Sequence, residues 1–286
     1  MRAFRSAHTF AVAAAPALAF LAALATPAHA QAAYREYVAL GDSFASGPGI
    51  STQVDKACQR SDHNYAHVLA EALEPAKFTD VSCGGAITAD LTQSQSTTGA
   101  PPQFGALSPN TDLVTLTIGG NDIGFGEIIG TCAQLSLGEW WSNPCQKHYT
   151  SGGTDQLQAR IEATAPKIDA AVRGIRARAP KAKIVVTGYL RITPDTGGCW
   201  PSVPIAPGDL PWLSTVHRSL DDMIEKRAEA NGATAANPFQ VSTGHDACKP
   251  TGVRWTEPVL NLAAPAHPNA AGMAAVAGLV KAKLST

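Results

Sequence analysis

Three polar residues, spaced widely along the 286-residue chain, have side chains that together provide the groups for nucleophilic catalysis. Ser43 ends a Gly-Asp-Ser tripeptide, Asn121 follows a pair of glycines, and His267 opens a His-Pro-Asn tripeptide. A serine hydroxyl becomes a nucleophile when a neighbouring base takes its proton. An asparagine amide can donate a hydrogen bond to the oxyanion that then forms. Ser43, His267 and Asn121 are therefore predicted to act as nucleophile, base and oxyanion donor.

Each of these segments is a weak signal when it is taken alone. Gly-Asp-Ser also forms ordinary turns and helix N-caps, and Gly-Gly-Asn-Asp is good turn material. The Gly-x-Ser-x-Gly elbow of the α/β-hydrolase fold is absent around Ser43. His267 is one of 8 histidines, and it is preferred because a proline and a helix-like segment follow it directly. Gly85, in a Cys-Gly-Gly-Ala segment, offers a second oxyanion donor through its backbone N–H.

The elements that must position these residues alternate between strand and helix patterns. Strands are predicted at 34–40, 78–82, 112–118, 183–187 and 233–236, and helices at 64–73, 154–178, 211–231 and 268–284. Such alternation predicts a parallel sheet covered on both faces. Ser43 and Asn121 fall just past strand ends, where ligands bind in these folds. The Pro/Gly-rich stretches 94–109, 194–211 and 249–268 are expected to be long loops that shape a cleft.

The beginning of the chain has the pattern of an export signal. Arg2 and Arg5 precede an apolar stretch over 10–25, and Ala28-His29-Ala30 has the small-x-small form that signal peptidase cleaves after. We therefore expect residues 1–30 to be a signal peptide, cleaved near Ala30, and residues 31–286 to be one secreted domain. A retained anchor is the alternative, although the apolar run is shorter than the ~20 residues that span a bilayer.

Composition excludes several kinds of partner. The formal net charge is -1, and no basic stretch with interleaved aromatic residues occurs, so no nucleic-acid partner is expected. No stable membrane insertion is expected beyond the leader. The chemistry described above needs no metal and no organic cofactor, and the protein is expected to be a monomer.

All 6 cysteines lie after the predicted leader. An even number in an exported chain predicts three disulfides, but six cysteines allow 15 pairings, and the sequence does not choose among them. The simplest hypothesis pairs neighbours, namely Cys58 with Cys83, Cys132 with Cys145 and Cys199 with Cys248. A zinc site is a weaker alternative because no Cys-x-x-Cys pair occurs.

Four segments in this order resemble the four sequence blocks of the SGNH hydrolases, also called GDSL esterases and lipases. Ser43, Gly85, Asn121 and His267 match the four block residues, and the resemblance extends over 38–272. The Gly-Asn-Asp-Ile-Gly-Phe segment that begins at Gly120 and the Gly-His-Asp-Ala-Cys segment that ends at Cys248 resemble the secreted bacterial, disulfide-containing branch. This resemblance implies a three-layer α/β/α sandwich with a five-stranded parallel sheet, and the neighbour pairing of cysteines.

The chain departs from the family at the residue that orients the histidine. The family usually has an aspartate three residues before the histidine, but this position is Ala264, and 261–266 contains no acid. The resemblance to members that use a backbone carbonyl implies that the Ala264 carbonyl accepts from His267. A neutral carbonyl can fix the tautomer and orientation of the ring. A remote acid, Asp246 or Glu257, is the alternative.

Together these features predict a serine esterase or lipase that acts on a small-molecule or lipid ester and forms an acyl-enzyme on Ser43. The oxyanion is expected to be held by the backbone N–H groups of Ser43 and Gly85 and by the side chain of Asn121. Six aromatic residues are candidates for lining an acyl-chain site: Phe44, Phe125, Trp140, Trp141, Trp200 and Trp212. A carbohydrate acetylesterase and a phospholipase remain alternatives on the same fold. A catalytically inactive surface-binding protein and a serine protease are alternatives of other classes.

Overall fold

The computed structural model describes residues 1, 3 and 34–285. The predicted signal peptide and its cleavage site near Ala30 therefore lie almost wholly outside the described residues. The described residues from Tyr34 to Ser285 belong to one compact unit. No helix among the described residues is long and apolar enough to cross a membrane.

A five-stranded parallel sheet lies at the centre of this unit, in the order β4-β1-β5-β6-β7. Its strands are β1 (Glu36–Gly41), β4 (Lys77–Asp80), β5 (Leu113–Thr117), β6 (Lys183–Thr187) and β7 (Thr234–Ala236). Both ends of each strand lie within two residues of the ends predicted from the sequence. The central strand β5 is buried over its whole length, as a sheet covered on both faces requires.

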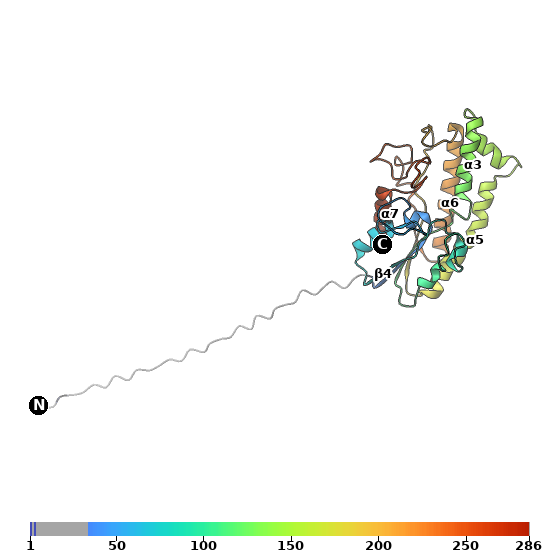
Figure 1. Ribbon diagram of the computed structural model, residues 1–286. Coiled ribbons are helices and arrows are strands. Elements are labelled where there is room, and N and C mark those ends of the chain that lie inside the picture. The colour runs from blue at the N-terminus through green and yellow to red at the C-terminus, as the bar shows by residue number, and fades with distance from the viewer. Residues whose placement is uncertain (2, 4–33, 286) are drawn as a thin grey trace. The chain divides into compact units, whose positions relative to one another are not determined.

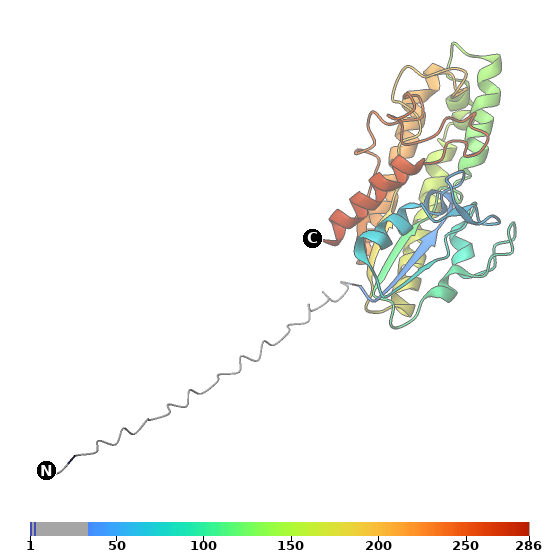
Figure 2. The ribbon, with the colours of Figure 1, turned by 60° about the vertical axis from the view of Figure 1, so that its left-hand side comes forward.

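Helices cover the two faces of the sheet. On one face lie α2 (Tyr65–Leu73) and α7 (Ala270–Leu284), and on the other lie α5 (Gln156–Arg178) and α6 (Leu210–Ala230) (Figures 1 and 2). Alternate strand residues enter two separate cores, so Tyr37 packs toward α2 and α7 whereas Val38 packs toward α5 and α6. The α/β/α sandwich with five parallel strands is confirmed.

Several elements were not predicted from the sequence. They are α1 (Ser43–Ser46), the antiparallel pair β2 (Gln53–Asp55) and β3 (Arg60–Ser61), α3 (Phe125–Gly138), α4 (Pro144–Thr150), and the short 3-10 turns η1 (Thr88–Leu91), η2 (Gln103–Ala106) and η3 (Pro207–Asp209). Three glycines lie within α3, and glycine disfavours a helix by about 1 kcal/mol relative to alanine. This explains why α3 lacks a helical signal. The helix expected from 268 starts at Ala270, because Asn269 is its N-cap and accepts from the Gly272 N–H at 3.1 Å.

Three disulfides connect the loops to this framework. They join Cys58 to Cys83, Cys132 to Cys145 and Cys199 to Cys248, which are the neighbour pairs expected from the resemblance. Cys132 lies in α3 and Cys145 in α4, so the second disulfide links two helices. No described cysteine is free.

Candidate active site

Ser43 lies immediately beyond the carboxyl end of β1, as the first residue of α1. Asp42 caps this short helix by accepting from the Phe44 N–H at 2.9 Å. Gly41 has a φ of +145°, and a Cβ there would lie 2.5 Å from the Thr117 carbonyl oxygen on β5. Only glycine permits this close approach of the two strands. The turn places Ser43 at the rim of the sheet with 8% of its surface exposed.

Gln103 holds the end of β1 by a pair of hydrogen bonds. Its Oε1 accepts from the Gly41 N–H at 2.8 Å, and its Nε2 donates to the Gly41 carbonyl at 2.9 Å. The Cys83 N–H also donates to this carbonyl, at 2.9 Å. Gln103 is buried at the start of η2, in a stretch expected from the sequence to be only a long loop, so its role in positioning the Ser43 turn was missed.

His267 reaches Ser43 from the opposite end of the chain. Its Nε2 lies 2.7 Å from Ser43 Oγ, and its Nδ1 lies 2.7 Å from the Pro265 carbonyl oxygen. The prediction that Ala264 supplies this carbonyl is wrong by one residue. The Ala264 carbonyl instead accepts from the His267 backbone N–H at 3.3 Å.

The backbone around His267 explains why the next carbonyl is used. Ala266 has a φ of +59°, in the left-handed region, and this turn directs the Pro265 carbonyl back toward the imidazole. The His267 carbonyl accepts from the Glu257 N–H at 2.8 Å, and this hydrogen bond also holds the backbone of His267 itself in place. In the described part of the chain, the ring hydrogen-bonds only to Ser43 and Pro265, so neither Glu257 nor Asp246 orients it.

The surroundings of His267 favour its neutral form. Burial lowers the pKa of the imidazole below its ordinary value, and the Pro265 carbonyl opposes this shift only in part. The Phe44 ring lies 5.3 Å from the imidazole, centroid to centroid, and contributes to this apolar environment. A neutral ring whose Nδ1–H donates to Pro265 leaves Nε2 free to accept the hydroxyl proton of Ser43.

Two further donors face the cavity beside Ser43. Gly85 has a φ of +77°, and no described atom accepts from its backbone N–H. Asn121 donates one Nδ2 hydrogen to the Ala86 carbonyl at 2.9 Å, which leaves the second hydrogen available. Gly85, Asn121, Ser43 and His267 all line the same cavity. The structure therefore brings together the four residues that the sequence singled out.

A buried network that the sequence did not indicate joins two of these segments. The Tyr189 hydroxyl donates to Asp42 Oδ2 at 2.6 Å and accepts from the Gly120 N–H at 2.7 Å. Burial raises the pKa of Asp42 to about 7, although its hydrogen bonds with Tyr189 and the Phe44 N–H oppose the shift. This chain of hydrogen bonds fixes the Ser43 turn relative to Asn121. The only sequence signal for Tyr189 is its position just past β6.

The cavity has a volume of about 300 Å³ and extends from Ser43 between α3 and α6. Its walls are mostly aliphatic: Ile123, Ile128, Ile129, Ile192, Leu213, Val216, Leu220 and Val259. Phe44 and Phe125 line it, as expected, but none of the four candidate tryptophans does. Trp140 instead packs edge-on against Trp200, with ring centroids 4.6 Å apart. Trp212 donates to Asp155, and Trp141 is 90% exposed.

The polar side chain of His217 also lies in the cavity lining, among the aliphatic residues of α6. Burial, together with the charge of Arg191, lowers the pKa of His217 to about 4. Its Nε2 lies 3.6 Å from Asp221 Oδ2, and burial raises the pKa of Asp221 well above its ordinary value. His217 is therefore neutral at neutral pH, which is compatible with an apolar ligand.

The family model of the GDSL-like Lipase/Acylhydrolase family matches residues 39–275. "Lipase 2" from Streptomyces coelicolor is 44% identical over 248 residues, covering 83% of this chain and 81% of that protein. "Lipase" from Streptomyces rimosus is 30% identical over 272 residues, covering 94% of this chain and 93% of that protein. Fold and relatives define the protein as a carboxylic ester hydrolase. The chain belongs to the GDSL-like lipase/acylhydrolase family.

Solved structures show the same relationship. The crystal structure of phospholipase A1 from Streptomyces albidoflavus NA297 has a TM-score of 0.74 and 31% identity, covering 88% of this chain and all of that one. An extracellular lipase from Streptomyces rimosus has a TM-score of 0.72 and 27% identity, covering 87% of this chain and 99% of that one.

Proposed function

We propose that this esterase works through an acyl-enzyme on Ser43, with His267 as the general base. His267 Nε2 takes the proton from Ser43 Oγ as the oxygen bonds to the carbonyl carbon of the ester. The imidazolium then gives this proton to the departing alkoxide oxygen, and a water molecule repeats the sequence to release the acid. The 2.7 Å separation of Oγ and Nε2 is the observation that carries the proposal.

The negative charge on the ester oxygen is held by the backbone N–H groups of Ser43 and Gly85 and by the free amide hydrogen of Asn121. The support is that these donors lie on one cavity wall beside Ser43, and that the Gly85 N–H has no other acceptor among the described atoms. Donors fixed in advance stabilise the transition state without the cost of reorganising solvent.

The Pro265 carbonyl takes the orienting role that an acid performs in a triad. It accepts from Nδ1–H, so it selects the tautomer in which Nε2 carries the lone pair. As a neutral dipole, it stabilises the imidazolium less than a carboxylate would. Burial lowers the pKa of His267, and the hydrogen bond to the Pro265 carbonyl opposes this shift only in part.

The cavity favours esters with an extended apolar acyl chain, because an acetyl group would leave most of its aliphatic wall empty. The relatives are named lipases, and a phospholipase A1 is among the similar structures, so a phospholipid is the second candidate. A series of nitrophenyl esters of rising chain length, run beside a phospholipid and an acetylated glycan, separates these substrates. A preference for acetyl esters alone would exclude the lipase assignment.

We also propose that the enzyme acts outside the cell as a monomer after removal of residues 1–30. Three disulfides support an oxidising compartment, and a similar structure is named an extracellular lipase. Amino-terminal sequencing of protein from the culture medium tests this, and a mature chain that still carries residues 1–30 would contradict it.

The central test is labelling with a fluorophosphonate, followed by mass mapping of the modified serine. Labelling is expected on Ser43 and is expected to disappear in Ser43→Ala. An unlabelled but folded protein would support the inactive surface-binding alternative, and full esterase activity in Ser43→Ala would refute the nucleophile assignment. Hydrolysis of casein would support a protease.

A further inference from the structure

The peptide between Gly84 and Gly85 supplies one of the two backbone donors of the proposed oxyanion site, the Gly85 N–H. A peptide unit is planar and trans, so the Gly84 C=O and the Gly85 N–H point in opposite directions. Gln95 Nε2 donates a 2.7 Å hydrogen bond to the Gly84 carbonyl oxygen. Whatever fixes this carbonyl therefore also fixes the direction of the Gly85 N–H.

This peptide needs an external support because glycine flanks it on both sides. Gly85 has a φ of +77°, which favours glycine, and a Cβ on Gly84 would make a tight contact of 3.2 Å with the Cys58 carbonyl oxygen. Glycine has the greatest backbone freedom of any residue. On one side the chain is held by the Gly84 N–H, which donates to the Cys58 carbonyl at 2.7 Å, beside the Cys58–Cys83 disulfide.

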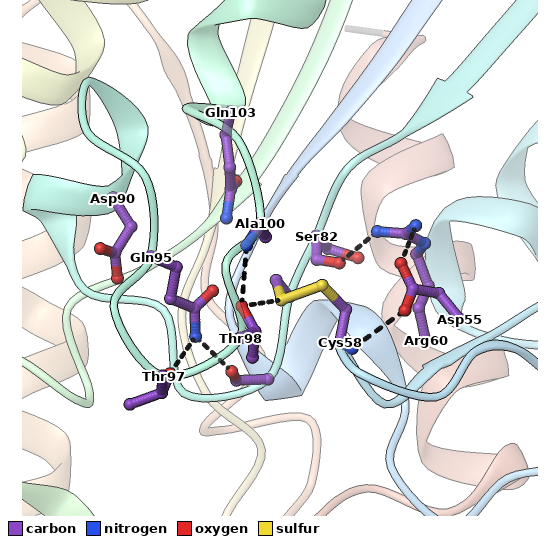
Figure 3. The surroundings of a disulfide bond; sticks show 12 residues. Asp55, Cys58, Arg60, Ser82, Asp90, Gln95, Thr97, Thr98, Ala100 and Gln103 are labelled. Carbon is purple, nitrogen blue, oxygen red and sulfur yellow. Dashed lines mark hydrogen bonds and ion pairs between the residues drawn. A yellow bond between two sulfur atoms is a disulfide. The ribbon is translucent and has the colours of Figure 1, made fainter.

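Several hydrogen bonds hold Gln95 in place, and Figure 3 shows the one that its side chain donates to Thr97. Its backbone N–H donates to the Ala100 carbonyl at 2.9 Å, and its carbonyl accepts from the Gly99 N–H at 2.8 Å. The second hydrogen of Nε2 goes to Thr97 Oγ1 at 3.1 Å. Only 4% of Gln95 is exposed. The side chain therefore has little freedom to move away from Gly84.

We propose that Gln95 is a positioning residue for ester hydrolysis, acting through the Gly84–Gly85 peptide. Its amide directs the Gly85 N–H at the developing oxyanion. It also polarises the peptide, because a hydrogen bond to the carbonyl strengthens the N–H of the same unit as a donor. This inference rests on the proposed catalytic role of Gly85.

The test compares Gln95→Met with wild type and with a control in the same loop, Thr98→Val. Methionine has a similar length but cannot donate. Thr98 Oγ1 accepts from the Ala100 N–H at 3.2 Å and does not touch the Gly84 carbonyl. The measurements are kcat and KM on a short nitrophenyl ester, and the inhibition constant of a trifluoromethyl ketone. The serine adduct of this ketone carries an oxyanion.

Loss of a whole oxyanion donor costs ~10²–10³ in kcat, so misdirecting one is expected to lower the kcat of Gln95→Met by about tenfold or more. KM should stay near the wild-type value, and binding of the ketone should weaken by the same factor as kcat. Thr98→Val should keep kcat within about twofold of wild type. A kcat loss in Gln95→Met without weaker ketone binding, or an equal loss in Thr98→Val, would overturn the proposal.

Gln95→Glu provides a second variant of almost the same shape. Its carboxylate cannot donate at pH 8, so it is expected to lose at least as much kcat as Gln95→Met. If both variants lose the folded structure by circular dichroism, Gln95 serves the fold and the proposal fails. If Ser43→Ala and Asn121→Ala are inactive while both Gln95 variants match wild type, only this inference fails. If Ser43→Ala stays active, the proposed function fails first.

Discussion

Asn121 donates one hydrogen of its side-chain amide to the Ala86 carbonyl, with an Nδ2···O distance of 2.9 Å. Ala86 directly follows Gly85, so one short loop holds two of the three proposed oxyanion donors, the Gly85 N–H and the Asn121 amide. The remaining amide hydrogen of Asn121 is thereby given a fixed direction, which preorganised stabilisation of an oxyanion requires.

Replacing Asn121 with alanine is expected to lower kcat by ~10²–10³, the usual cost of losing one oxyanion donor. The lost bond to Ala86 should reduce the free energy of unfolding by only ~0.5–1.5 kcal/mol. Steady-state kinetics and urea unfolding check the two effects separately. If the free energy of unfolding falls by more than this range and kcat falls only as far as the loss of folded protein explains, Asn121 has a structural role only.

The acid side of the pH profile should report His267. Burial lowers the pKa of this imidazole from its ordinary value of 6.5, and the base must be neutral to accept the serine proton. As the pH falls, kcat/KM should therefore persist below pH 6.5 and then decline as the ring becomes protonated. Circular dichroism over the same range separates protonation from unfolding. A midpoint above 6.5 would show that the ring is stabilised as a cation.

Neutralising the nearby acids should have little effect on catalysis. Nδ1 of His267 bonds to the Pro265 carbonyl, while Glu257 bonds to Arg254, Asn261 and Asn269. Glu257→Gln and Asp246→Asn are therefore expected to retain kcat within about threefold, whereas loss of the acid in a true triad costs ~10⁴. A fall of that larger size in either variant would show that an acid, not the carbonyl, supports the imidazole.

Filling the cavity should shorten the preferred acyl chain. Ile129 lines the cavity from α3, so Ile129→Trp is expected to lower kcat/KM for long-chain nitrophenyl esters by about tenfold or more, with the acetyl ester little affected. Leu137→Trp is the matched control, because Leu137 lies on the same helix but is 72% exposed. Equal losses on all chain lengths in Ile129→Trp would mean that acyl chains bind elsewhere.

The Cys58–Cys83 disulfide should matter to catalysis as well as to stability. It joins residues with a sequence separation of 25, for which the chain-entropy model gives ~3.5 kcal/mol. Replacing both cysteines with serine is expected to cost that stability and also to lower kcat, because the Cys58 carbonyl anchors the Gly84 N–H.

The comparison variant replaces both cysteines of the Cys199–Cys248 disulfide with serine. These cysteines have a sequence separation of 49, and neither lines the cavity. It should lose a slightly larger free energy of unfolding, ~4 kcal/mol, with kcat on a short ester largely kept. Equal kcat losses in the two double variants would show that the first disulfide acts only through overall stability.

The sequence by itself determined the layered fold and the four segments at its rim. Strand and helix patterns depend on neighbouring residues, so runs such as the one that became β5 could be predicted locally. Ser43 and Asn121 follow strands, and parallel strands bring their carboxyl ends to one edge, so their meeting follows from topology. The cysteine pairs and the four-block assignment depended on the resemblance to a family, because spacing alone allowed other readings.

Only the tertiary structure decided the details that tune the site. The choice of Pro265 over Ala264 depends on one left-handed residue, Ala266, which no local pattern required. Gln95 and Gln103 act through hydrogen bonds to backbone groups that lie 11 and 62 residues away in the chain. Such contacts leave no periodic signal in the sequence, because a single polar side chain in a loop looks the same whether it is solvated or buried. Burial, which sets the pKa of His267, also exists only once the chain has folded.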